Sequence, residues 1–194
     1  MAIEGLHIGN TNPLNLLNEE PRLVIYDPGH LINNPAQNLH PFDSLFIIHS
    51  DLERWLLEFV QIRDKQWIIF LILPNFTPDE VVQFVNSHVV NQQRLHSFYL
   101  IFNNGVRFNS QFRMRFPGIL QWCRSFTHRL YNDIRSVCAT VCDLQITFCD
   151  QRLNEIEDCI DDHSQSIVNM YNIQKFRLYG LQATYTLAMS LSYE

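Results

Sequence analysis

The feature that most constrains the fold of this chain is a series of short apolar runs that recur along its first half. Each run is four to seven residues long, rich in β-branched and aromatic residues, and too short for a helix. Uninterrupted apolar runs of this length are typical of strands buried on both faces, as in a parallel sheet. They predict strands at about residues 22–27, 45–49, 67–73 and 97–102.

Two of these runs are followed directly by helix start signals. Ser50-Asp-Leu-Glu53 and Thr77-Pro-Asp-Glu80 both fit the capping box, in which a hydroxyl and a carboxylate satisfy free backbone N–H groups. Apolar residues at helical spacing follow each box. Because strand, capping box, helix and strand repeat in this order, we predict an α/β fold with a doubly wound, mostly parallel sheet of the receiver-like or flavodoxin-like kind.

The rest of the chain fits this repeat less closely. The link at 28–44 contains three prolines, so a loop or one short turn of helix is predicted there in place of a crossover helix. A fifth strand is predicted at 116–122 and a helix at 126–141. Residues 144–148 fit either a sixth strand or a continuation of that helix, and we favour the strand.

The end of the chain predicts an amphipathic helix at 176–191. Its apolar stripe is expected to pack on the domain core and consists of Leu178, Leu181, Tyr185 and Ala188, widened by Leu187 and Leu191.

Length and composition indicate one folding unit. The chain has 194 residues, of which 46% are hydrophobic and 18% charged, a composition far from that of disordered proteins. Residues 1–20 show no periodicity and predict a flexible N-terminal arm. Residues 21–194 are then a single α/β domain that includes a C-terminal helical portion.

Charge and hydropathy exclude two classes of partner. The formal net charge is −6 and no basic stripe is present, so a nucleic-acid partner is not expected. The most apolar run, Trp67–Leu73, has seven residues, whereas a membrane-spanning helix needs about 20. We therefore expect no membrane span.

The cysteines indicate a reducing compartment. Five are present, an odd number, with no CxxC pair, and the first residues lack the features of a signal peptide. Both facts favour reduced thiols and a cytoplasmic location. Four of the five lie among apolar neighbours and are interpreted as small core residues.

Several segments together resemble a known family. They are Arg22-Leu-Val-Ile-Tyr-Asp27, Asp51-Leu-Glu-Arg-Trp-Leu56, Trp67–Leu73, Ser97-Phe-Tyr-Leu-Ile-Phe102 and Cys142-Asp-Leu-Gln-Ile-Thr-Phe148. The pattern resembles the N-terminal α/β module of invertebrate multidomain proteins that carry tetratricopeptide repeats or a mono-ADP-ribosyltransferase domain. The resemblance implies a receiver-like or flavodoxin-like sheet that carries no transferase residues of its own.

A candidate ligand site follows from the predicted topology. In open α/β sheets, ligands bind where the carboxyl ends of the strands meet the following helices. The candidate ligand-binding residues at that edge are Asp27, His49, Asp51, Asn75 and Asn103. Helix capping and turn formation explain most of the same residues without any ligand.

The motifs of several enzyme classes are missing. A phosphoacceptor receiver needs an aspartate at the end of the third strand, where this chain has Leu73-Pro-Asn75, and it needs a lysine near the fifth strand, which is absent. No glycine-rich nucleotide loop or nucleophile elbow occurs. The spacing of His30, His40, Asp43 and His49 matches no zinc pattern. We therefore predict no catalytic residue, no metal and no cofactor.

These observations favour a non-catalytic regulatory or protein-interaction module, with a protein as its partner. The alternative is a small-molecule sensor or small enzyme that uses the strand ends around Asp27 and His49.

Overall fold

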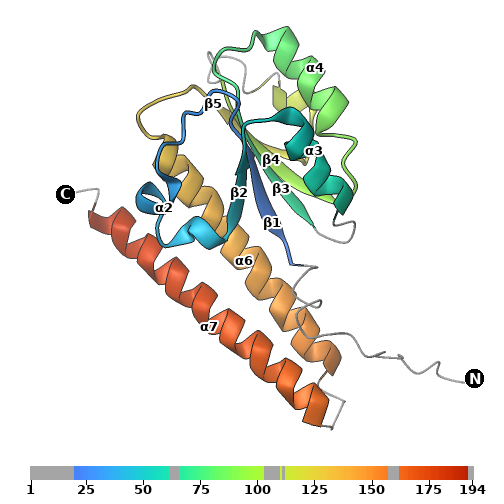
Figure 1. Ribbon diagram of the computed structural model, residues 1–194, viewed down its shortest axis with the longest axis vertical. Coiled ribbons are helices and arrows are strands. Elements are labelled where there is room, and N and C mark those ends of the chain that lie inside the picture. Colours follow the sequence, from blue (N-terminus) through green and yellow to red (C-terminus); the bar gives the residue numbers. More distant parts are fainter. Residues whose placement is uncertain (1–19, 62–65, 103–109, 111, 157–161, 192–194) are drawn as a thin grey trace, which may run out of the picture.

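A five-stranded parallel sheet forms the centre of the computed structural model, which describes residues 20–61, 66–102, 110, 112–156 and 162–191 (Figure 1). The strand order is β2-β1-β3-β4-β5, and every neighbouring pair is parallel. This is the flavodoxin-like order of doubly wound folds, so the predicted fold class is confirmed. The strands are β1 (Arg22–Tyr26), β2 (Phe46–His49), β3 (Trp67–Ile72), β4 (Leu95–Ile101) and β5 (Leu120–Arg124).

Helices cover both faces of the sheet. The helical elements are α2 (Pro35–Asn38), the 3₁₀ turn η2 (Phe42–Ser44), α3 (Leu52–Gln61), α4 (Pro78–His88), α6 (Leu130–Ile156) and α7 (Asp162–Leu191). On one face, the aromatic side chains of α3 and α4 pack against alternate residues of β1, β3 and β4. On the other face, α6 packs against the remaining strand residues, together with the link at 28–44 and part of α7.

The helix start signals are confirmed for α4 and need a correction for α3. Thr77 forms the predicted capping box with Glu80 at the start of α4. At α3, the helix begins one residue later than the box at Ser50 predicts, and the Asp51 carboxylate accepts the N–H of Arg54 at 2.9 Å. Asp51 is therefore the capping residue, because a carboxylate serves this position as well as a hydroxyl does.

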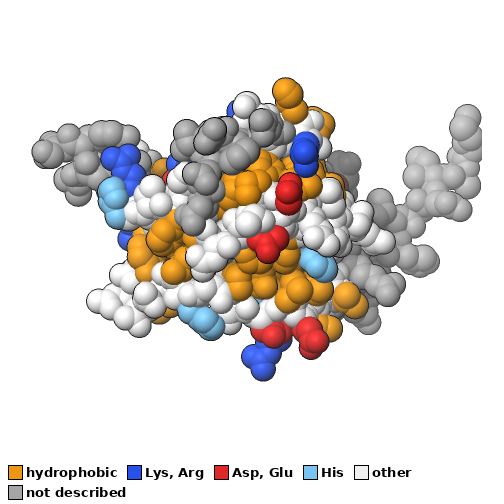
Figure 2. Space-filling model, turned by 90° about the horizontal axis from the view of Figure 1, so that it is seen from above, with side chains coloured by type: hydrophobic (Ala, Val, Ile, Leu, Met, Phe, Trp, Pro, Cys, Tyr) orange, Lys and Arg blue, Asp and Glu red, His pale blue; other side chains and the backbone are white. Residues whose placement is uncertain are grey.

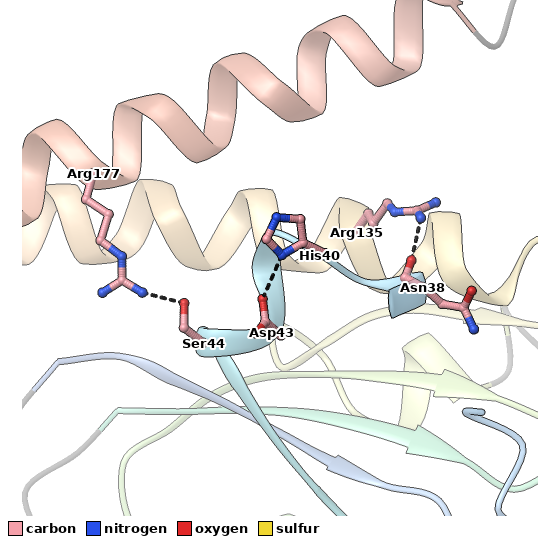
Figure 3. A network of polar contacts seen from close by, with 6 residues as sticks. All are labelled: Asn38, His40, Asp43, Ser44, Arg135 and Arg177. Carbon is pink, nitrogen blue, oxygen red and sulfur yellow. Dashed lines mark hydrogen bonds and ion pairs between the residues drawn. The ribbon is translucent and has the colours of Figure 1, made fainter. Parts of the chain in front are cut away.

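The link at 28–44 forms short helical turns, as its prolines predict. Leu39 and Phe42 from this link, and Leu45 directly after it, are buried in the same core cluster as α6. Polar contacts fix the link to both C-terminal helices (Figure 3): Arg135 donates to the carbonyl of Asn38, and Arg177 Nη2 donates to Ser44 Oγ at 2.5 Å. The link and the C-terminal helices thus cover the face on which a crossover helix would lie.

The prediction of a strand at 144–148 is wrong, because these residues belong to α6. The buried side chains of this helix continue past the predicted end at 141 without a break in their helical spacing, through Gln145, Ile146 and Cys149. The helix also begins at Leu130, later than the predicted 126. The β-branched residues that suggested a strand are accommodated because α6 packs against both the sheet and α7.

Two further boundaries differ from the predictions. The fifth strand is β5, which begins at Leu120 rather than 116, because a turn at Pro117–Ile119 precedes it and Gly118 adopts a φ of 80°. The closing helix begins at Asp162 rather than 176. Except for Glu20, the predicted N-terminal arm lies outside the described residues.

The helices α6 and α7 form an antiparallel hairpin that extends past the sheet (Figure 1). Beyond the sheet the two helices pack on each other through Cys149, Ile167 and Tyr171. None of the helices in the described part of the chain is long and apolar enough to cross a membrane.

Candidate functional site

The carboxyl edge of the sheet brings the predicted site residues to one end of the molecule. Asp27 follows β1, His49 ends β2, Asp51 caps α3, and Asn75 lies in the turn after β3. Asn103 lies outside the described residues. Figure 2 views the molecule from this end, where hydrophobic side chains dominate and isolated acidic and histidine side chains lie among them.

Asp27 is only 2% exposed, and its main role is to close the loop that follows β1. Its N–H donates to the carbonyl of His49 at 2.8 Å, which extends the pairing of β1 with β2. Its Oδ2 accepts the N–H of Ile32 at 2.8 Å. Its Oδ1 is buried and has no hydrogen-bond partner among the described residues. Asp27 therefore has a structural role and one carboxylate oxygen that this role does not use.

The other predicted residues also have local roles. His49 Nε2 lies 3.1 Å from Glu58 Oε1 on α3, and both side chains are largely buried. Asp51 holds the N-terminus of α3, as described above, and Asn75 is exposed in a turn. These contacts join β2 to α3, and they explain the polar residues of this edge without a ligand.

An aromatic cluster that the sequence did not single out fills the α3 and α4 side of this edge. The ring of Tyr26 lies 5.2 Å from that of Trp55 and is stacked on Phe84 at 5.3 Å. Burial, with a smaller contribution from the Asp51 carboxylate, raises the pKa of Tyr26. Trp55 and Phe84 are among the apolar residues that follow the two capping boxes at helical spacing, but which strand residue they contact depends on the packing of the sheet.

The four described cysteines are buried, as their apolar neighbours predict, and form no disulfide; Cys159 lies outside the described residues. Burial raises the pKa of Cys123, Cys142 and Cys149 to about 12 in each case, and it also raises the pKa of Cys138. Because a thiolate is the reactive form of cysteine, these four groups are unsuited to nucleophilic chemistry near neutral pH.

We expect these four thiols to react slowly with a maleimide or disulfide reagent in the native protein at pH 8. A thiol with a pKa near 8.5 is about one-quarter thiolate at that pH, whereas a pKa of about 12 leaves roughly one part in ten thousand. Labelling should therefore be at least about 1000-fold slower than in the unfolded chain. Peptide mass mapping of the labelled protein measures this site by site, and fast native labelling of Cys138 or Cys142 would contradict the burial of α6.

The described residues contain no group of three histidine, cysteine or acidic side chains that could hold a metal ion. Two pockets lined by described residues lie at the opposite, amino edge of the sheet. One is lined by Glu20, Pro21, Arg22, Ser44, Leu45 and Gln145, and the other by Gln66, Arg94, Leu95 and His96. Neither pocket includes a predicted site residue.

The most exposed apolar surface of the described chain lies on α7. Leu178 and Leu181 are buried in the core and Tyr185 is partly buried against it, as predicted. The prediction that Leu187 widens this buried stripe is wrong, because Leu187 is 65% exposed. It lies on the opposite side of the helix, where α6 leaves α7 uncovered. The side chains of Ala188 and Leu191 are not described.

We call this uncovered side the outer face of α7 and define it by Ile173, Phe176, Gly180, Ala183 and Leu187. Ile173 is 71% and Phe176 is 83% exposed. The sequence could have indicated this face, because apolar residues occur all around α7 and are not confined to one stripe.

Comparisons of this chain with protein-family models, with curated proteins and with solved structures give no match.

Proposed function

We propose that this protein is a non-catalytic protein-interaction module, and that the outer face of α7 binds a helix of another protein molecule. The observation that carries the proposal is the cluster of large apolar side chains on this face. Together with Tyr179 beside them, Ile173, Phe176 and Leu187 are each more than half exposed. Contiguous apolar surface of this kind on a folded domain is typical of an interaction site.

The charges of α7 support the same proposal. From Ser164 to Leu191 the only charged residues are Lys175 and Arg177. Lys175 donates to Asp150 on α6, and Arg177 donates to Ser44 in the link. Both cations thus bond to the domain itself, and the five residues of the outer face carry no charge. Depletion of charged side chains is typical of the core of protein interfaces.

The remaining features fit a protein partner inside the cell. The net charge of −6 disfavours nucleic acid as the partner. Buried cysteines that form no disulfide among the described residues support a reducing compartment such as the cytoplasm. A regulatory module placed beside other domains, as in the family that the sequence resembles, would also need such a docking face.

Photo-crosslinking tests this proposal. A photoreactive phenylalanine derivative at position 176 of the full chain, irradiated in an extract of the native cells, is expected to give one discrete adduct. Excess purified wild-type protein that carries a size tag should remove that adduct, either by competing for a different partner or by replacing an untagged copy in the pair, whereas excess tagged Phe176→Glu protein should not. The matched control carries the same group at Leu57, which is 51% exposed on α3. No adduct at 176, or equal adducts at both positions, would contradict the proposal.

The second candidate function is a small-molecule site at the carboxyl edge. It is favoured by one observation, the buried Asp27 Oδ1 without a described partner. Such an oxygen is suited to accept a hydrogen bond from an amine or to coordinate a bound cation. Native mass spectrometry distinguishes the candidates: a small molecule retained by the wild type and lost from Asp27→Asn would favour this second function.

A further inference from the structure

The outer face of α7 has the spacing of a coiled-coil seam. Its members Ile173, Phe176, Gly180, Ala183 and Leu187 follow one another at intervals of three, four, three and four residues. This is the heptad pattern that keeps one side of a helix facing a partner helix. The spacing therefore indicates that a helix, rather than a flat surface or a loop, covers this face.

No contact within the described part of the chain requires a glycine at position 180, the centre of this seam. Gly180 is exposed in the middle of a 30-residue helix, and a Cβ added there would meet no atom within 4 Å apart from its own stretch of helix backbone and its two chain neighbours. Glycine is less favourable than alanine at such a position, because it loses more conformational freedom when the helix forms. With Ala183 one turn away, it makes a flat centre where another backbone can approach closely.

The seam is complementary to itself when two copies run antiparallel. Gly180 then faces Ala183 of the second copy, and Phe176 faces Leu187 of the second copy. Both pairs have the same midpoint, between Leu181 and Gln182, as a two-fold axis requires. The smallest residues thus lie at the axis, and a large aromatic residue meets a leucine on each side of it.

The area also suits a pair of copies. The four large exposed side chains of this surface would bury on the order of 500 Å² per copy, since a large aromatic side chain buries about 150–250 Å² when fully covered. A stable interface buries roughly 800 Å² per partner. The polar side chains that flank the seam, such as Asn172 and Thr184, supply the remaining contact.

We propose that the protein forms a homodimer through an antiparallel pairing of the outer faces of α7. This rests on the proposed function and names its partner, a second copy of the chain. In Figure 1 the sheet, the link and α6 all lie on one side of α7, so its opposite side is open to a second copy.

The oligomeric state of the full chain tests this proposal. Sedimentation velocity or light scattering should show a dimer for the wild type. Phe176→Glu, which places a carboxylate opposite Leu187, should weaken the dimer by about 30-fold or more, as expected for a central interface residue. The matched control Leu57→Glu replaces an exposed apolar residue on α3 and should leave the dimer unchanged.

Gly180→Leu separates loss of the dimer from loss of folding. The site is open in the single chain, so this variant should fold, with a melting temperature equal to or higher than that of monomeric Phe176→Glu protein. At the axis of the dimer, however, leucine would force the two helices apart. We therefore expect a folded monomer. A dimer that persists in both Phe176→Glu and Gly180→Leu would overturn the proposal.

Disulfide formation between cysteine variants tests the antiparallel orientation of the two α7 helices. An oxidised mixture of Phe176→Cys and Leu187→Cys proteins should form disulfides between unlike variants. A parallel pair would instead join like variants, and that result would overturn the antiparallel arrangement.

A wild type that stays monomeric would overturn the homodimer. If the group at position 176 then still gives its competed adduct with a different protein, the proposed function stands and only the identity of the partner is wrong.

Discussion

Deleting residues 176–194 is expected to leave the protein unfolded or aggregated. The deletion removes Leu178 and Leu181, which are buried in the same core cluster as the sheet residues Ile25 and Phe70. It also removes Tyr185, whose ring packs edge-on against Phe42 at 6.4 Å. At about 1.5–3 kcal/mol each, three such side chains contribute roughly 5 kcal/mol, comparable with the whole stability of many domains.

Circular dichroism and thermal unfolding of the truncated protein measure this loss. A point variant keeps the test informative: Leu178→Ala should lower the free energy of unfolding by about 2–5 kcal/mol. The control Leu57→Ala removes an exposed leucine and should change it by no more than about 0.5 kcal/mol. A truncated protein that keeps its melting temperature would show that the second half of α7 belongs to an interface rather than to the core.

Trp55→Ala is expected to lower the free energy of unfolding by about 3–5 kcal/mol. Trp55 is fully buried, and its ring lies 4.9 Å from that of Phe59, 5.2 Å from Tyr26 and 5.9 Å from Phe84. It therefore connects α3, the sheet and α4, and its loss would leave a cavity between three elements. Chemical denaturation measures the change.

The matched control for this variant is Val60→Ala on the same helix, because Val60 is 63% exposed and its loss should cost no more than about 0.5 kcal/mol. Trp55→Phe should cost less than Trp55→Ala for two reasons. It keeps most of the ring, and it removes Nε1, which is buried and has no hydrogen-bond partner among the described residues. Equal losses for Trp55→Ala and Val60→Ala would contradict the packing of α3 on the sheet.

The sheet was predictable because its signals are local. A run such as Trp67–Leu73 is apolar at every position, and only a strand covered on both faces buries all of it. The capping box of Thr77 likewise involves residues three positions apart. The repeat of βαβ units predicts that the strands are parallel, as they are in the structure.

The errors arose where distant packing decides the structure. Residues 144–148 have β-branched side chains that suggest a strand, but they are helical because α7 provides a second surface for α6. The same limit applies to the candidate site. The sequence placed Asp27 and His49 at one edge correctly, but the contact of His49 with Glu58 depends on how α3 lies on β2. The exposure of Phe176 likewise depends on which side of α7 meets α6.

The polar contacts between the link at 28–44 and the C-terminal helices have a consequence for the order of folding. The N–H of Asn33 donates to the Tyr131 hydroxyl across 98 positions of sequence, and Arg177 reaches Ser44 across 133. A chain that depends on such distant contacts folds more slowly than one built from local contacts. During synthesis, one face of the sheet would also stay bare until α6 and α7 have left the ribosome. Folding of the first β-α-β segment would thus be completed by residues from the opposite end of the chain, which makes the N-terminal half a poor independent fragment.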